Sequence, residues 1–237
     1  MRPALFHACF AAAALAVLVA GTSGCGHAPG YPPPPIARPE NVLDFATLYS
    51  QNCAACHGAT GENGPAMDLS NPEYQALVDD ASLRKWISGG MPGTEMPAFA
   101  QSAGGTLTDA QIGALIAGMR KHWSAPNVFA GATPPPYAQN QAGDAHRGQQ
   151  TYQARCLRCH APSPQQITSS DYLALVGDQA LRTIVIAGRP DIGQPDWRHL
   201  GPATPLSTQE VDDLVAYLAS LRNPQPAPSN SAAQAGR

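Results

Sequence analysis

The amino-acid sequence predicts an all-α fold made of two tandem copies of one small domain. Two observations support this prediction: a segment with cysteines and a histidine occurs twice, and each copy ends in an amphipathic helical pattern. A third observation is that the alternation of apolar and polar residues typical of strands is nearly absent. The 237 residues leave room for two such domains with terminal extensions.

Comparison of the chain with itself defines the two copies. Cys53–His57 and Cys156–His160 have cysteines and a histidine at the same positions, at an offset of 103 residues. Residues 73–97 then match residues 171–195 at an offset of 98. The second copy therefore lacks five residues between its cysteine motif and its middle helix.

The last helix of each copy has a start signal and an apolar face. Thr108 and Gln111 have the spacing of a capping box, and so do Ser207 and Glu210. Apolar residues follow at i, i+3, i+4 and i+7, namely Ile112, Leu115, Ile116 and Met119 in one copy and Val211, Leu214, Val215 and Leu218 in the other. We expect these faces to pack into two domain cores.

Composition and charge exclude two classes of protein. The hydrophobic share of 43% is ample for a core, so most of the chain is not disordered. The net charge is −3 and no basic run occurs, so we expect no nucleic-acid partner. Pro- and Gly-rich segments predict a linker at residues 124–144 and a disordered tail at residues 223–237.

The amino terminus has the pattern of an export signal. Arg2 precedes an apolar run over residues 4–20, and small residues follow this run. A short positive region, an apolar centre and a small-residue cleavage zone are typical of a secretory signal. We therefore expect residues 1–24 to be a signal peptide and the protein to be exported.

A lipid anchor is predicted directly after this signal. Thr22–Cys25 resembles the lipobox of bacterial lipoproteins, in which the cysteine is lipidated, although Thr22 stands where Leu is usual. Ordinary signal cleavage is the alternative. We expect residues 25–40 to be a lipid anchor and a stiff Pro-rich spacer that tether the protein to the inner or the outer membrane, on the periplasmic side.

The two cysteine motifs carry the chemistry. Each reads C-x-x-C-H, which is the attachment signature of c-type haem. Two thiols at this spacing on a helical turn can each form a thioether to one haem vinyl group, and the next histidine then lies under the iron. We therefore expect two covalently bound haem c groups, attached at Cys53, Cys56, Cys156 and Cys159 and ligated on the proximal side by His57 and His160.

Two other chemistries use paired cysteines. The four thiols could form one zinc site, or each pair could be a redox dithiol. Neither explains a histidine directly after both pairs, and a thioredoxin-like motif needs a βαβ context that is missing. Haem attachment is therefore the favoured interpretation.

On these motifs both copies resemble class I cytochrome c domains, and the chain resembles bacterial di-haem c-type cytochromes. The resemblance covers residues 41–123 and 145–222, and it rests on C-x-x-C-H, the Met-Pro loop and the terminal helix. It implies a helical domain around each haem. It also implies transfer of single electrons between larger redox complexes.

The distal iron ligand of the first copy is predicted in the loop at residues 90–99. A thioether opposite the proximal histidine completes octahedral iron and raises its reduction potential. Met96, in a Met-Pro-x-Phe sequence, resembles the axial ligand of the family more closely than Met91. Met67 follows His57 too closely and is expected to pack against the haem or its loop.

The second copy has no methionine after its cysteine motif. Ungapped alignment places Gln194 at the position of Met96, whereas His199 follows His160 by 39 residues, the spacing between His57 and Met96. Three states are open for this iron: ligation by His199, weak ligation by the oxygen of Gln194, or an iron that is five-coordinate or carries water.

These features favour a lipid-tethered electron carrier over an enzyme. Two haems of different potential would relay electrons between a quinol-oxidising complex and an oxidase or a soluble cytochrome. One alternative is a di-haem peroxidase-like enzyme or a gas-binding protein that uses an open second haem. Another is a haem subunit fixed in a membrane quinol-oxidising complex.

Overall fold

The computed structural model describes residues 38–161, 167–201 and 204–222, and these residues form helices and no strand. The predicted all-α fold is thereby confirmed. The predicted signal peptide, Cys25 and the predicted tail at residues 223–237 lie outside the described residues. None of the helices in the described ranges is long and apolar enough to span a membrane.

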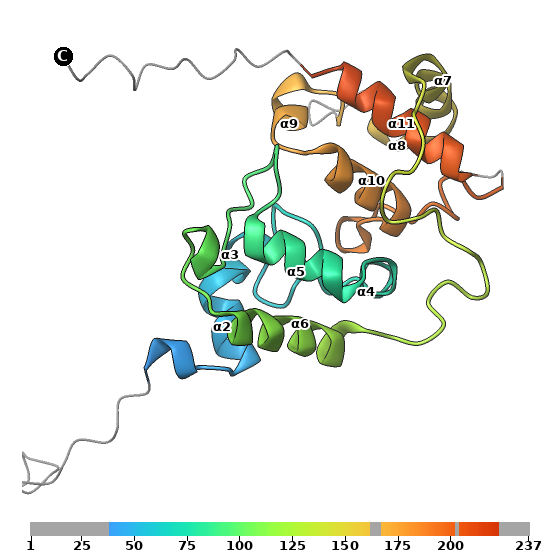
Figure 1. The fold of residues 1–237 in the computed structure, drawn as a ribbon. Helices are drawn as coiled ribbons and strands as arrows, with labels where there is room; N and C mark the ends of the chain where they lie inside the picture. Colours follow the sequence, from blue (N-terminus) through green and yellow to red (C-terminus); the bar gives the residue numbers. More distant parts are fainter. Residues whose placement is uncertain (1–37, 162–166, 202–203, 223–237) are drawn as a thin grey trace, which may run out of the picture. The chain divides into compact units, whose positions relative to one another are not determined.

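The helices form two series of the same order (Figure 1). The first half of the molecule contains α2 (Phe45–Asn52), α3 (Ala54–His57), α4 (Pro72–Leu77), α5 (Asp80–Gly89) and α6 (Asp109–Trp123). The second half contains α7 (Ala145–Arg155), α8 (Leu157–His160), α9 (Ser170–Ala174), α10 (Asp178–Ala187) and α11 (Thr208–Ser220). Short 3-10 helices are η1 (Pro39–Asn41), η2 (Gln101–Ala103) and η3 (Pro190–Ile192).

Both predicted capping boxes are present. The Thr108 hydroxyl accepts a hydrogen bond from the Gln111 amide, and the Gln111 side chain accepts one from the Thr108 amide, 3.0 Å away. Ser207 and Glu210 make the same pair of bonds at the start of α11. The apolar residues predicted on α6 and α11 are at most 4% exposed, so these helices bury the expected faces.

Each half has a core of its own. Leu48, Leu83, Ile112 and Leu115 belong to the first core, and Tyr152, Leu181, Ile186 and Leu214 to the second. The first core also includes Ala187, which lies on α10 of the second half. In agreement with this shared residue, the described residues from Pro39 to Arg222 belong to a single compact unit.

The first and last helices of each half cross at close range, where one of them has a glycine. A Cβ atom on Gly118 of α6 would lie 2.1 Å from the Phe45 ring of α2. A Cβ atom on Gly148 of α7 would lie 1.9 Å from the Asp213 carbonyl oxygen and 2.8 Å from the Tyr217 Cβ atom of α11. These crossings fix the positions of α2 and α7, the helices that lead into the two cysteine motifs.

Candidate functional site

The first cysteine motif lies where α2 ends and α3 begins. The Cys53 amide donates to the Tyr49 carbonyl over 2.8 Å, and the His57 amide donates to the Cys53 carbonyl over 3.0 Å. These bonds wind the motif into one helical turn, with both thiols free of disulfides. Burial raises the pKa of Cys53 to about 11, so this thiol is protonated at neutral pH.

His57 is oriented by a backbone carbonyl. Its Nδ1 atom lies 2.7 Å from the Met67 carbonyl oxygen, which can only accept, so Nδ1 carries the proton. Burial lowers the pKa of His57, which favours the neutral ring. The Nε2 atom is then the unprotonated nitrogen, and a hydrogen bond at the other ring nitrogen is the usual support for a metal-ligating histidine.

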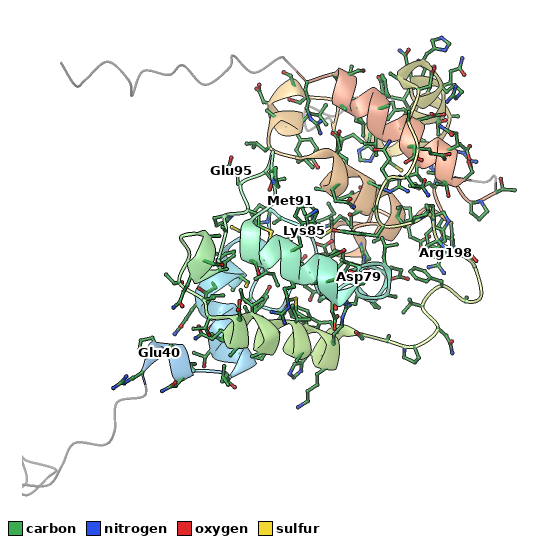
Figure 2. The ribbon with its side chains drawn as sticks, viewed as in Figure 1. Glu40, Asp79, Lys85, Met91, Glu95 and Arg198 are labelled. Carbon is green, nitrogen blue, oxygen red and sulfur yellow. The ribbon has the colours of Figure 1, made fainter. Side chains whose placement is uncertain are left out.

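The loop after α5 carries both methionines that were considered as distal ligands. Met96 packs against the first core, together with Cys53 and Met67, and its amide donates to the Thr94 hydroxyl. The Met91 amide donates to the Met96 carbonyl over 3.1 Å, which closes the loop into a turn. Met91 and Glu95 mark this loop in Figure 2. Met96 therefore packs against the same core as the motif cysteine Cys53, and its role as iron ligand stays a prediction.

The second cysteine motif repeats the geometry of the first. The Cys156 amide donates to the Tyr152 carbonyl over 2.8 Å, and the His160 amide donates to the Cys156 carbonyl over 3.0 Å. Burial raises the pKa of Cys156 to about 11 and lowers the pKa of His160. Residues 162–166, which follow this motif, lie outside the described residues.

A cavity joins the second motif to the loop opposite. Its lining includes Cys156, Cys159, His160 and Gln194. The side chains of the walls are largely apolar and include Leu181, Ile184, Val185, Leu214 and Leu218. Two thiols, an imidazole and an apolar wall are the donor set and the surroundings that a c-type haem needs, so these residues fit the predicted group.

The structure separates the two distal candidates of the second half. Gln194 lines the cavity, and its amide nitrogen donates to the Ile184 carbonyl over 3.1 Å. The His199 side chain is 66% exposed, is not among the residues that line this cavity, and places Nδ1 3.1 Å from an Asp196 carboxylate oxygen. The amide of Gln194 therefore lies on the same cavity as His160, and the choice of ligand stays a prediction.

The zinc alternative finds no support in the described residues. No three His, Cys, Asp or Glu side chains within those ranges are grouped closely enough to hold a metal ion together. The two cysteine pairs are therefore not brought into one four-thiol site. Each cysteine motif is therefore a separate candidate site.

Two arginines at the second cavity were missed by the sequence reasoning. Arg155 and Arg158 line the cavity and add positive charge beside the motif. Their position directly before Cys156 and within the motif was the available signal, because residues on the motif turn lie near whatever the turn binds.

These observations define a protein with two c-type cytochrome domains, one in each half. The chain belongs to the family described as cytochrome C oxidase, cbb3-type, subunit III, which matches residues 40–117 and 143–218. Membership of this family implies that the protein binds haem.

The chain is similar to a curated relative and to a chain of a solved structure, among others. The dihydro-heme d1 dehydrogenase of Pseudomonas aeruginosa is 32% identical over 130 residues, a match that covers 52% of this chain and 22% of the dehydrogenase. The chain therefore corresponds to about a fifth of that relative. A chain from the reducing HAO-like protein complex of Kuenenia stuttgartiensis is 17% identical, with 76% of this chain and 96% of that chain covered and a TM-score of 0.42.

Proposed function

We propose that the protein is a di-haem electron carrier with one haem c bound covalently in each half. The observation that supports this most directly is the second cavity, where both motif cysteines, His160 and Gln194 line one largely apolar space. When bound, each haem supplies an iron that gains or loses one electron. The residues around it determine how easily that electron is gained.

The two halves provide different surroundings for this chemistry. In the first half, the Met67 carbonyl holds the His57 ring, and Met96 is the proposed thioether ligand, which favours ferrous iron. In the second half, the proposed distal group is the amide of Gln194, a weaker ligand than a thioether or an imidazole. We infer that the first site has the higher reduction potential.

The similarity to the dehydrogenase is consistent with a redox role. A dehydrogenase removes electrons from its substrate, and these electrons need an acceptor. We propose that this chain exchanges electrons with other redox proteins, which by chemical class are a quinol-oxidising complex and an oxidase or a soluble cytochrome. A role as a fixed haem subunit of such a complex would differ only in how long the partners stay bound.

We also propose that Cys25 is lipidated after export. The support is the apolar run at residues 4–20 followed by the lipobox-like Thr22–Cys25. In the producing bacterium, Cys25→Ser should move the protein from the membrane fraction to the soluble fraction. Retention of this variant on the membrane would show that another contact anchors the protein.

The electron-transfer proposal is tested on the purified protein by haem quantification and an anaerobic redox titration. We expect two haems per chain, two one-electron transitions, and rapid reoxidation by a soluble ferricytochrome. One haem per chain would contradict the assignment of two sites. Two haems with no electron exchange would contradict the carrier function.

Gln194 also favours a second candidate function, binding of a gas or peroxide at a weakly ligated iron. Carbon monoxide added to the dithionite-reduced protein distinguishes the two. Binding to neither haem, or to one haem without turnover of hydrogen peroxide, supports an electron carrier. Binding to one haem, with turnover of hydrogen peroxide, supports a peroxidase-like enzyme.

A further inference from the structure

The loop that carries Gln194 is attached to the first half of the molecule. The Arg189 guanidinium donates to the Gly64 carbonyl over 3.0 Å, and the Asn63 amide donates to the Asp191 carboxylate over 3.0 Å. Arg189 and Asp191 also form an ion pair of 2.7 Å, with side chains that are 8% and 0% exposed. A buried ion pair with further hydrogen bonds fixes this loop against residues of the other half.

The attachment joins the segment that orients His57 to the loop that carries Gln194. The Arg189 and Gln194 backbones exchange two hydrogen bonds of 2.9 Å, so a shift of Arg189 is transmitted to Gln194. On the other side, Gly64 lies three residues before Met67, whose carbonyl orients the His57 ring. Hydrogen bonds and the short backbone segment from Gly64 to Met67 therefore connect the proximal histidine of the first half to Gln194 of the second.

In a second, independent contact, a residue of the second half lies against the loop of the first half that carries Met96. Gly177, directly before α10, lies against the loop of the first half that leads to Met96. A Cβ atom on Gly177 would lie 3.1 Å from the Pro92 carbonyl oxygen and 3.4 Å from the Thr94 Cγ2 atom. The Thr94 hydroxyl in turn accepts a hydrogen bond from the Met96 amide.

Both contacts use residues in which the two copies differ. Arg189 stands where the first copy has Met91. Gly177 stands where the first copy has Asp79, which caps α5 by accepting a hydrogen bond from the Ser82 amide. The second copy has no side-chain cap at this position, and the glycine leaves room for the loop of the other half.

We propose that Arg189 and Gly177 are positioning residues that couple the two haem sites, because each distal loop rests on the other half. This inference rests on the proposed function. A change at either contact should alter ligand binding at the haem of one half and the electronic signature of the haem of the other. A residue with a merely structural role would change stability alone.

The first test is Arg189→Met in the holoprotein, which introduces the residue found in the first copy. We expect the carbon monoxide affinity of the second-half haem to change threefold or more, and the electron paramagnetic resonance g values of the first-half ferric haem to shift. Arg147→Met is the matched control, because Arg147 pairs with Asp213 within the second half. The control should leave both signals unchanged.

The second test is Gly177→Ala. Alanine readily adopts the backbone conformation at this position, since the φ angle of Gly177 is −70°. The added methyl group should press on the loop at Pro92 and Thr94 and change the g values of the first-half haem. Met96→Ala assigns which signal belongs to that haem. Unchanged g values and unchanged carbon monoxide affinities in both folded variants would overturn the coupling.

Failure of the coupling is distinguishable from failure of the proposed function. Haem content and the redox titration are measured on the same samples before the ligand experiments. If wild-type protein holds two haems that titrate normally while the variants behave as wild type, the carrier function stands and the coupling is wrong. If wild-type protein lacks a second haem, the proposed function itself is wrong.

Discussion

Met96 and Met91 lie on the same short loop, and only Met96 packs against the first core. If Met96 is the distal ligand, Met96→Ala should open the first iron, and carbon monoxide should bind there after reduction. The same variant should lower the reduction potential of this haem, because a thioether favours ferrous iron. Difference spectroscopy of the reduced protein with and without carbon monoxide measures the first effect.

Met91→Ala is the matched control for this prediction. It removes a thioether from the same loop, but the backbone bond from the Met91 amide to the Met96 carbonyl can remain. We expect its carbon monoxide binding to equal that of the wild type. The opposite pattern, with Met91→Ala opening the iron, would assign the ligand to Met91.

Asp191 should make the stability of the protein depend on pH. The hydrogen bonds from Arg189 lower the pKa of Asp191, so its ionised form stabilises the folded state. This contribution is present above the unfolded-state pKa of about 3.9 and is lost as the pH falls through the lower folded-state pKa. Asp191→Asn should therefore cost about 2 kcal/mol near neutral pH and less in acid.

Urea unfolding at neutral and at acid pH checks this difference. Asp171→Asn is the control, because Asp171 is exposed on α9, and its effect should stay within about 0.5 kcal/mol at either pH. An Asp191→Asn effect that is the same at both pH values would contradict the assigned ion pair.

At the scale of elements, the crossing of first and last helices is built in opposite ways in the two halves. Phe45 on the first helix faces Gly118 on the last in one half, and Gly148 on the first helix faces Tyr217 on the last in the other. The aromatic residue and the glycine have exchanged helices. The close approach is thus kept, because one small and one large residue fill the same space.

Gly148→Ala tests this crossing in the second half. The new Cβ atom would meet the Asp213 carbonyl oxygen at 1.9 Å, so α7 and α11 must separate, at a cost of about 3 kcal/mol. The free energy of unfolding from urea titration measures the loss. Since α7 leads into the second cysteine motif, we also expect less haem to be attached in that half.

Gly113→Ala is the control substitution for a helical glycine. Outside its own helix backbone, the nearest atom to its added Cβ is the flexible end of Arg84 at 3.5 Å. Alanine should stabilise α6 by about 0.5–1 kcal/mol, because glycine is the poorer helix former. A loss of stability in both variants would contradict the assignment of the cost to the crossing, because helix propensity favours alanine at both positions.

At the scale of the whole molecule, buried and partly buried hydrogen bonds join the two halves. The Asn71 side chain caps α4 by accepting from the Glu73 amide, and it donates to the Ala187 carbonyl over 2.9 Å. The Tyr137 hydroxyl lies 2.9 Å from the Trp86 ring nitrogen of α5, and the Tyr137 carbonyl accepts from Gln179 of α10. The segment between the copies therefore contacts both halves.

Asn71→Ser should weaken the contact between the two halves and preserve the cap of α4. Serine is a good cap but cannot reach the Ala187 carbonyl, which would lose its buried donor at a cost of about 1–2 kcal/mol. We expect the two halves of the variant to unfold in separate steps, as followed by calorimetry. Asp79→Ala, which removes a cap within the first half, should leave a single transition.

Local features of the fold were predictable, and contacts between distant residues were not. The capping boxes of α6 and α11 and their buried faces follow from residues at most seven positions apart, so the sequence pattern contains them. The attachment of Arg189 to Gly64 joins residues 125 positions apart. A single arginine in a loop gives no sequence pattern from which a contact with Gly64 could be predicted.

Motif spacing and helical periodicity are local properties, so the two C-x-x-C-H motifs and the duplicated helical pattern could be identified without a structure. Two candidates for the second distal ligand stayed open, since one-dimensional spacing favoured His199 and alignment favoured Gln194. The folded chain shows which of the two shares a cavity with His160. The contacts of Arg189 with Gly64 and Gln194 fix the course of the loop after α10. Gln194 therefore lines the cavity, and His199 is exposed.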